Sequence, residues 1–381
     1  MTAALVRILG DFDLAEELVQ EALLEAIQHW PREGIPEKPG AWLLTTARRK
    51  AVDQLRRQAR FRDKLAQLEG DLMRDDTAEG DDRLRLIFTC CHPALSREAQ
   101  VALTLRAVAG LTTIEIARAF ITSEATIAQR IVRAKRKIVD AKIPYRVPAE
   151  RDLGERLNEV LAVLYLMFNE GYLATAGEQA TRRDLAEDAA WLAGLMVRLM
   201  PDEPEALGLL ALMRLHLARA RGRFDDAGNL VLLQDQDRSR WDRERIASAM
   251  VLLQRAASLH RPGPYQLQAA IAACHAEAPT WAETDWQQIV ALYDALLQQM
   301  PSPVVELNRG IARRYRDGAA VALSDVDRLT EALDGYYLFH ATRAELLRDL
   351  GREPEARTAL GRALELTANP AERALLQQRL S

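Results

Sequence analysis

Apolar positions recur every three to four residues along almost the entire chain, and this spacing predicts α-helices. Ala, Leu, Glu and Arg, which favour helices, dominate the composition, and no stretch alternates β-branched with polar residues as a strand does. We therefore expect an all-α fold. The predicted helices cover residues 2–30, with a break at Gly10 and Asp11, and then residues 41–60, 82–92, 96–109, 113–120 and 124–141.

A loop separates the first two helical segments. Asp13 is the expected N-cap of the longer part of the first segment, because Glu16 follows it by three residues and closes a capping box. Residues 31–40 contain three prolines and two glycines and are expected to form the loop. The next helix has an apolar face opposite its arginines, formed by Leu44, Ala47, Ala51 and Leu55.

Residues 111–141 have the pattern of a helix-turn-helix. Thr112 and Glu115 form a second capping box before a short helix, and Ser123 is the expected cap of the longer helix that follows. The predicted buried residues are Ile114, Ala117 and Phe120 on the short helix, and Ile127, Ile131, Ala134 and Ile138 on the long one. The outer face of the long helix is left to Thr126, Gln129, Arg130, Arg133 and Lys137. In this geometry the second helix docks in the major groove of DNA, where arginine pairs with guanine or phosphate.

The chain divides into four segments. Residues 1–61 and 83–147 are expected to form two small helical domains, and the acidic segment 62–82, which lacks large apolar clusters, a flexible linker between them. Residues 148–381 form a helical extension, part of which repeats with a period of about 34 residues. Small or apolar residues at matching offsets are typical of tetratricopeptide (TPR) repeats, so the extension is predicted to be TPR-like. The matching residues are Gly310, Ala322, Val326 and Leu329, with Ala344, Ala356, Leu360 and Ala363 as their counterparts.

The net charge of −4 conceals two basic segments. Residues 1–147 hold 24 Lys and Arg against 21 Asp and Glu, whereas residues 148–381 hold 27 against 34. Within the first part, residues 41–60 carry six basic side chains and one acidic one, and residues 126–146 carry seven and one. Two basic helices favour two separate contacts with a polyanion, with solvated charged faces as the alternative.

Composition and motifs also limit the class of function. Three cysteines form no disulfide framework, which fits a reducing cytoplasm. Cys90, Cys91 and His92 are adjacent, so they are better explained as a packed helix segment than as a metal site. We find no nucleophile elbow, P-loop or dinucleotide-binding loop, and therefore predict no enzyme activity, no cofactor and no metal. No export signal and no apolar run of about 18 residues is present, which predicts a cytoplasmic protein without a membrane span.

Three blocks of the chain, in order, resemble RNA polymerase sigma factors of the extracytoplasmic-function (ECF) type. Residues 11–30 (DFDLAEELVQEALLEAIQHW) look like region 2.1–2.2, and residues 41–60 (AWLLTTARRKAVDQLRRQAR) look like regions 2.3–2.4. Residues 111–138 (LTTIEIARAFITSEATIAQRIVRAKRKI) look like region 4. The lack of a region 3, with the 62–82 linker in its place, is also as in the ECF type. The resemblance implies core RNA polymerase and promoter DNA as partners.

The resemblance also implies roles for individual residues. Contacts with the clamp helices of the polymerase would come from Asp13, Glu16, Glu17, Gln20 and Glu21. The −10 promoter element would be held by Pro36, Gly40, Trp42, Arg48, Arg49, Lys50, Arg56 and Arg57. The −35 element would be read by Thr126, Gln129, Arg130, Arg133 and Lys137. Many relatives carry Asn at the position of Arg49, so a phosphate contact is expected there.

Four further stretches, residues 88–95, 164–178, 232–243 and 263–279, resemble an ECF subgroup that has a TPR-like C-terminal extension. Its members are commonly encoded beside small DGPF-motif (YCII-related) proteins, which implies such a protein as a further partner. We expect the extension to dock on the N-terminal domains through Asn169, Glu170 and Tyr172 and to regulate them, with a satisfied core as the alternative role of these residues. The alternative function is an operator-binding helix-turn-helix regulator with a TPR-like sensor domain.

Overall fold

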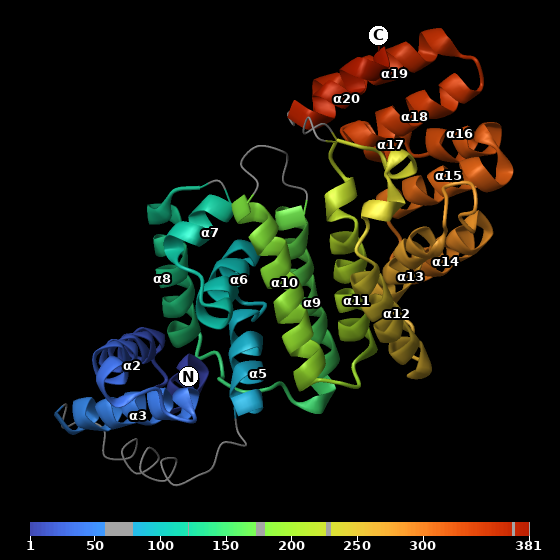
Figure 1. Cartoon of the computed structure of the whole chain (residues 1–381). Helices are drawn as coiled ribbons and strands as arrows, with labels where there is room; N and C mark the ends of the chain where they lie inside the picture. Colours follow the sequence, from blue (N-terminus) through green and yellow to red (C-terminus); the bar gives the residue numbers. More distant parts are fainter. Residues whose placement is uncertain (58–78, 121, 173–179, 226–229, 368–369, 381) are drawn as a thin grey trace. The chain divides into compact units, whose positions relative to one another are not determined.

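The computed structural model describes residues 1–57, 79–120, 122–172, 180–225, 230–367 and 370–380. These residues form helices and no strand, with one isolated bridge between Phe224 and Leu230, so the predicted all-α fold is confirmed. The chain folds as two compact units, Met1–Leu164 and Tyr165–Ser381 (Figure 1). None of the described helices combines the length and the apolar character that a membrane crossing requires.

The first unit begins with a bundle of three helices, α1–α3. The elements of the whole first unit are α1 (Thr2–Leu9), α2 (Phe12–Glu33), α3 (Pro39–Arg57), α5 (Glu79–Cys90), α6 (Arg97–Thr104), the π-helical turn η2 (Leu105–Ala109), α7 (Thr113–Ala119), α8 (Glu124–Asp140) and the first part of α9 (Glu150–Tyr172). In the bundle, α2 packs against both α1 and α3. The apolar residues predicted for α3, Leu44, Ala47 and Ala51, are buried.

The two ends of α2 correct two predictions. The N-cap of α2 is Asp11 rather than Asp13, because the Asp11 carboxylate accepts hydrogen bonds from the backbone N–H groups of Asp13 (2.9 Å) and Leu14 (3.1 Å). α2 also continues through Pro31 to Glu33 instead of ending at Trp30, and Gly34, with a φ of 89°, then ends it. Pro31 has no N–H to donate to the carbonyl four residues earlier, but the helix is still closed at its end by the N–H of Gly34, which donates to the carbonyl of Trp30 (3.0 Å).

The helix-turn-helix forms as predicted at both of its caps. The Glu115 carboxylate accepts from the N–H of Thr112 (2.7 Å), and the Thr112 hydroxyl accepts from the N–H of Glu115 (3.2 Å). The Ser123 hydroxyl accepts from the N–H of Thr126 (3.1 Å) and caps α8. One prediction for α7 is wrong: Ile114 is 45% exposed, whereas Ile116 is completely buried. α7 has only seven residues and packs on α8 and η2, so its buried side is set by these neighbours.

The helix α9 spans the boundary between the two units. Its first part packs on the first unit, where the Arg156 guanidinium donates to the carbonyl of Phe88 (2.6 Å) and Glu159 pairs with Arg97 (2.8 Å). The compact first unit therefore extends to Leu164, past the expected start of the extension at residue 148.

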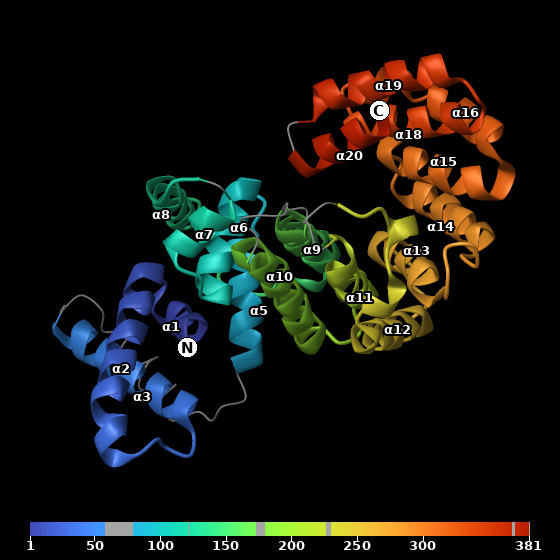
Figure 2. The ribbon, with the colours of Figure 1, turned by 45° about the horizontal axis from the view of Figure 1, so that its top comes forward.

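The second unit is a succession of helices in which neighbours along the chain pack on each other (Figure 2). A Cβ at Gly310 would lie 3.1 Å from Cγ2 of Val326, so glycine lets α15 and α16 approach closely. The counterparts Ala344, Ala356 and Leu360 are buried where α18 meets α19. The helices of the second unit after α9 are α10 (Ala180–Leu199), α11 (Pro204–Ala218), α12 (Arg243–Ser258), α13 (Pro264–Glu277), α14 (Trp286–Gln299), α15 (Pro303–Asp317), α16 (Ala319–Asp327), α17 (Thr330–Leu333), α18 (Tyr337–Asp349), α19 (Glu353–Leu366) and α20 (Pro370–Leu380).

Candidate nucleic-acid and protein interfaces

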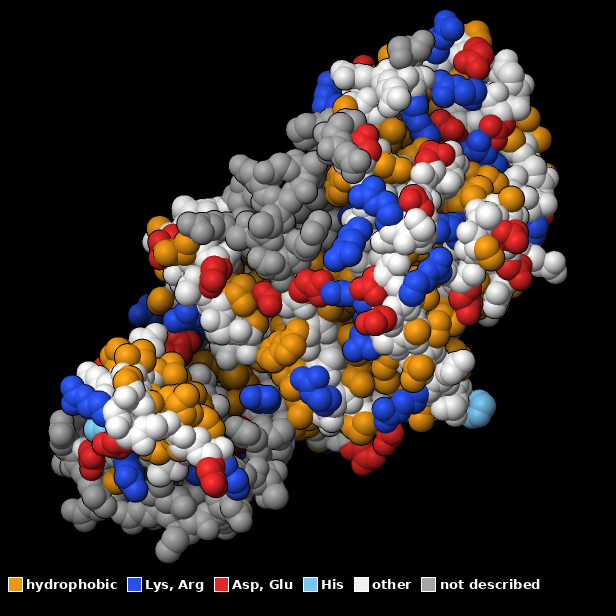
Figure 3. All heavy atoms as spheres, in the orientation of Figure 1, with side chains coloured by type: hydrophobic (Ala, Val, Ile, Leu, Met, Phe, Trp, Pro, Cys, Tyr) orange, Lys and Arg blue, Asp and Glu red, His pale blue; other side chains and the backbone are white. Residues whose placement is uncertain are grey.

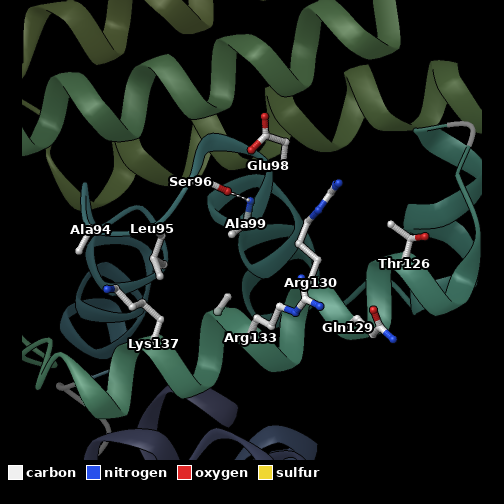
Figure 4. Close-up of a pocket in the computed structure, with 11 residues that line it drawn as sticks. Ala94, Leu95, Ser96, Glu98, Ala99, Thr126, Gln129, Arg130, Arg133 and Lys137 are labelled. Carbon is white, nitrogen blue, oxygen red and sulfur yellow. Dashed lines mark hydrogen bonds between the residues drawn. The ribbon is translucent and has the colours of Figure 1, made fainter.

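One side of α8 is buried and another lines an open groove. Ile127, Ile131, Ala134 and Ile138 are buried as predicted, and α8 packs on α6 and α7. The five residues predicted to read DNA lie together along a groove of about 460 Å³. In Figure 4 the side chain of Arg130 extends from α8 towards Glu98 at the start of α6, Lys137 lies near Leu95, and Thr126 and Gln129 lie on the other side of Arg130. The structure thus brings the whole predicted −35 set to one surface.

The chemistry of this groove suits a nucleic-acid backbone and base edges. Arg130, Arg133 and Lys137 are pure hydrogen-bond donors, and no ion pair engages them among the described residues. Thr126 and Gln129 donate and accept, as base edges require. At the rim of the groove, the pKa of the Glu98 carboxyl is lowered. The largest cause is a hydrogen bond from the backbone N–H of Glu98 itself, followed by one from the side chain of Ser96. An ionised carboxylate repels phosphate at that edge of the groove.

The predicted −10 residues lie at the start of α3 and along it. Gly40 belongs to the first turn of α3, and Pro36 lies in the short loop before it. Trp42 is half-buried and packs edge-to-face on Trp30 of α2, with ring centroids 5.5 Å apart. Part of its surface therefore packs α3 against α2. Arg49 is exposed. The side chains of Arg56 and Arg57 lie outside the described residues.

Lys50 and Glu21, predicted for different partners, meet each other. The ammonium of Lys50 lies 3.2 Å from the Glu25 carboxylate and 3.3 Å from that of Glu21. Glu25 is the largest cause of the raised pKa of Lys50, followed by the opposing effect of burial and by Glu21. In the unbound protein these groups therefore join α3 to α2.

The acidic start of α2 is also engaged, by basic residues far along the chain. The ammonium of Lys135 on α8 lies 2.7 Å from the Asp13 carboxylate and 3.3 Å from that of Glu16. The Arg106 guanidinium lies 3.6 Å from Glu16. Residues more than 85 positions apart make these pairs, so local sequence patterns gave no sign of them.

The remaining predicted polymerase residues, Glu17 and Gln20, are exposed on α2, and apolar neighbours accompany them. Leu24 and Ile27 are 59% and 69% exposed, and the sequence analysis did not single them out. Figure 3 shows apolar side chains gathered among charged ones on the visible face of the α1–α3 bundle. An exposed apolar stripe on a surface helix is typical of a protein contact. The spacing of Gln20, Leu24 and Ile27 along one side of α2 was the available signal.

The residues predicted to join the extension to the N-terminal domains lie near the end of α9. The ring of Tyr172 stacks on Phe168 (5.3 Å between centroids), and the Arg223 guanidinium lies over it at 4.1 Å. Asn169 is hydrogen-bonded to Tyr165, whose pKa is raised by burial. The side chain of Glu170 lies outside the described residues. The contacts described for Tyr172 and Asn169 are thus with residues of the second unit.

Cys90 ends α5 and Cys91 follows it, and both are completely buried, which confirms the packed-segment interpretation. Burial raises the pKa of both thiols, that of Cys91 to about 11, so both stay protonated. Among the described residues, no group of three or more His, Cys, Asp or Glu side chains is placed to hold a metal.

Comparison with known proteins finds a matching family for each of two segments of the first unit. Residues 1–61 match sigma-70 region 2, and residues 85–138 match sigma-70 region 4. The ECF RNA polymerase sigma factor SigK of Mycobacterium ulcerans (strain Agy99) is 31% identical over 149 residues, covering 35% of this chain and 77% of that protein. SigK of Mycobacterium bovis (strain BCG / Pasteur 1173P2) is 30% identical over 141 residues, covering 35% and 74%. The chain belongs to the ECF family of RNA polymerase sigma factors.

The part beyond region 4 is shared with other proteins as well. Residues 156–257 match a family of unknown function (DUF6596). The uncharacterized protein R00370 of Rhizobium meliloti (strain 1021) is 46% identical over 389 residues, covering 99% of this chain and 92% of that protein. In this sigma factor, region 2 comprises α1–α3 and the helices α5–α8 contain region 4. The extension is helical and follows region 4 directly through α9.

Proposed function

We propose that this ECF sigma factor binds core RNA polymerase through α2 and reads promoters with two surfaces. The −10 element would contact the start of α3 and its arginines, and the −35 element would contact the groove side of α8. Transcription would then initiate from promoters that carry both elements. The single observation that carries this proposal is the groove on α8. It gathers three cations and two side chains that donate and accept hydrogen bonds beside a doubly capped helix-turn-helix.

The groove supports direct reading of bases as well as phosphate binding. The guanidinium groups of Arg130 and Arg133 offer the paired donors that match the O6 and N7 acceptors of guanine. Gln129 has the amide that pairs with adenine in the same groove. Each such pair discriminates against a wrong base by about 1–3 kcal/mol. Substituting these residues should therefore remove both affinity and sequence preference.

Transcription in vitro with purified bacterial core polymerase tests promoter recognition. With genomic DNA as template and the 5′ ends of transcripts sequenced, the wild-type protein should initiate at sites that share two short motifs. The double variant Arg130→Ala/Arg133→Ala should lose at least about tenfold in initiation, the loss of one good base contact. Arg151→Ala is the matched control, since it removes a positive charge from a side chain of the same unit that is 86% exposed. Equal initiation by the double variant and the control would contradict the proposal.

Binding to core polymerase without DNA tests the other surface. Ile27→Glu places a charge in the exposed apolar stripe of α2 and should weaken binding by more than about tenfold, as burying an unpaired charge does. Val139→Glu is the control, because Val139 is similarly exposed (64%) but lies on α8. If both variants bind core polymerase as the wild type does, α2 is not the contact.

We further propose that the TPR-like extension regulates the sigma regions through the first part of α9. The Arg156 and Glu159 contacts with region 4 support this, because they fix the start of the extension against the promoter-reading domain. The double variant Arg156→Met/Glu159→Gln should change initiation by about threefold or more, in either direction, at unchanged helix content. Unchanged initiation would argue against regulation through α9.

A DGPF-motif (YCII-related) protein is the proposed further partner of the extension, supported by the resemblance of residues 164–178 and the three other stretches. The protein would act in the cytoplasm, where polymerase and promoters are. Purified together, the two proteins should elute as one complex from a sizing column. Separate elution at micromolar concentrations would contradict this partnership.

A further inference from the structure

The second unit contains a cavity of about 360 Å³ that neither promoter reading nor polymerase binding uses. Its walls come from residues 232–234, from α13, α14 and α15, and from α18 and α20, with Trp281 in the loop between α13 and α14. Small-molecule sites in proteins enclose about 300–1,000 Å³ and are lined mostly by apolar and aromatic side chains with a few polar groups. This cavity lies at the lower end of that range, so it suits a ligand of one or two rings.

Aromatic rings form one wall of the cavity. The imidazole of His275 stacks on Trp281, with ring centroids 5.6 Å apart, and Trp286 stacks on Tyr315 at 4.2 Å. The two stacks meet edge-to-face between Trp281 and Trp286, at 4.8 Å. All four side chains are only partly buried, although aromatic rings stabilise a protein most when they are covered. The wall therefore leaves aromatic surface on which a flat apolar ligand can pack.

Charged side chains lie beside this wall. Arg314 and Arg379 both line the cavity, and the Arg314 guanidinium lies 5.4 Å from the centre of the Tyr315 ring. The Glu345 carboxylate lies 3.1 Å from Arg379 and 3.9 Å from Arg314. Asp349 holds Arg314 through two further hydrogen bonds, of 2.5 and 2.7 Å. These carboxylates fix both guanidinium groups in place, and the lining still carries two positive charges against the one negative charge of Glu345.

The potential behind the aromatic wall favours an anion over a cation. Burial lowers the pKa of His275 to about 4, and the charges of Arg219 and Arg238 add to this effect, so the imidazole is neutral at pH 7. Neither of these arginines forms an ion pair with another described residue, and the Arg238 guanidinium donates instead to the carbonyls of His275 and Ala278. Aromatic rings alone would also suit an ammonium ligand, but the neighbouring guanidinium groups repel one.

We propose that this cavity binds a small aromatic carboxylate, with its ring on the wall of Trp281 and Trp286 and its carboxylate beside Arg379 and Arg314. A guanidinium offers a carboxylate two parallel N–H donors, and such charge-assisted bonds are roughly twice as strong as neutral ones. Among the described residues Arg379 has one carboxylate partner and Arg314 has two, so Arg379 carries most of this contact. The inference goes beyond the proposed function, because binding needs neither polymerase nor DNA.

Two probes that differ in charge test the proposal on the wild-type chain. We expect 2-naphthoate to bind the full-length protein with a Kd of about 1 mM or tighter, as a compact ligand of its size can, in a ligand-observed NMR titration. 2-Naphthamide has the same rings without the charge and should bind at least about tenfold more weakly, the value of one charge-assisted hydrogen bond. No binding of 2-naphthoate at about five times that concentration, or equal binding of the two probes, would overturn the proposal.

Substitution of one arginine locates the bound carboxylate. Arg379→Met should weaken 2-naphthoate binding by about tenfold, while Glu345 keeps Arg314 as a partner. Arg328→Met is the matched control, because Arg328 is 68% exposed, pairs with Asp325 and lies outside the cavity lining. The control should bind the probe as the wild type does.

Filling the cavity locates the bound ring. Asn308 lines the cavity and is exposed, so Asn308→Trp places an indole in the space of the ligand and should abolish binding of 2-naphthoate. If Asn308→Trp and Arg379→Met both bind the probe as Arg328→Met does, the probe lies elsewhere and the assignment of this cavity is wrong. The comparison of the two probes on the wild type decides the question of charge even if a variant fails to fold.

Discussion

Gly208 offers a sharp test of how the extension is packed. It lies on α11 where that helix meets the start of α13, and a Cβ there would lie 2.7 Å from the backbone nitrogen of Gln266. The same Cβ would lie 2.9 Å from the Cα of Gln266, so the backbone of α13 itself stands in the way. That backbone is held in place, because the Glu205 carboxylate accepts from the N–H groups of Tyr265 (2.9 Å) and Gln266 (3.1 Å).

We expect Gly208→Ala to lower the free energy of unfolding of the second unit by about 1–3 kcal/mol. This is the usual cost of overpacking, and it outweighs the roughly 0.5–1 kcal/mol that alanine gains over glycine within a helix. Urea unfolding of the full chain, followed by tryptophan fluorescence, measures the loss; four of the six tryptophans lie in the second unit.

Gly194→Ala on α10 is the control with the opposite expected sign. Its Cβ would lie no closer than 3.7 Å to any atom, so only the gain in helix preference remains, and stability should rise by about 0.5–1 kcal/mol. The packing argument is refuted if Gly208→Ala is as stable as the wild type, or if both variants shift the midpoint in the same direction.

Three further outcomes are expected. Arg133→Ala should reduce the slope of log affinity against log salt for promoter DNA by about one, the loss of one phosphate contact, and fluorescence anisotropy should find no such change in Arg151→Ala. Thr112→Ala, which removes the cap of α7, should cost about 1 kcal/mol in thermal unfolding of the first unit, and a neutral result would show that the cap is not needed. Burial lowers the pKa of His216 to about 3 and that of His275 to about 4, against about 6.5 when unfolded, so the unfolded chain binds more protons below pH 6.5. Stability of the second unit should then fall by about 2 kcal/mol for each histidine between pH 7 and pH 5; His216→Gln should flatten this dependence in urea titrations, and His260→Asn, an exposed site, should not.

Local patterns predicted the parts of this protein that depend on neighbours in the sequence. The Thr112 and Glu115 box and the Ser123 cap need only residues three positions apart, and the buried side of α8 follows from its own spacing over 17 residues. Asp13 was the wrong cap because Asp11 lies two positions away and offers the same chemistry.

Other features depend on residues that meet only after folding. Lys135 has the same charge as Arg133 and Lys137 but lies on another side of α8, and only the fold brings the carboxylates of Asp13 and Glu16 to it. In a seven-residue helix such as α7, either isoleucine can satisfy the pattern, so contacts with α8 and η2 decide between Ile114 and Ile116. Leu24 and Ile27 share one side of α2 with Gln20 in the sequence pattern, but only the packing of α2 shows that this side is left exposed.

The continuity of α9 affects where this protein can be divided into fragments or chimeras. Glu150–Tyr172 is one helix, and its residues are divided between the two units. A chimera that grafts the extension onto a two-domain sigma factor would have to carry residues 150–164, together with the region 4 surface that receives them. Substitutions at the region 4 surface around Phe88 and Arg97 should therefore also affect how the first part of α9 is held.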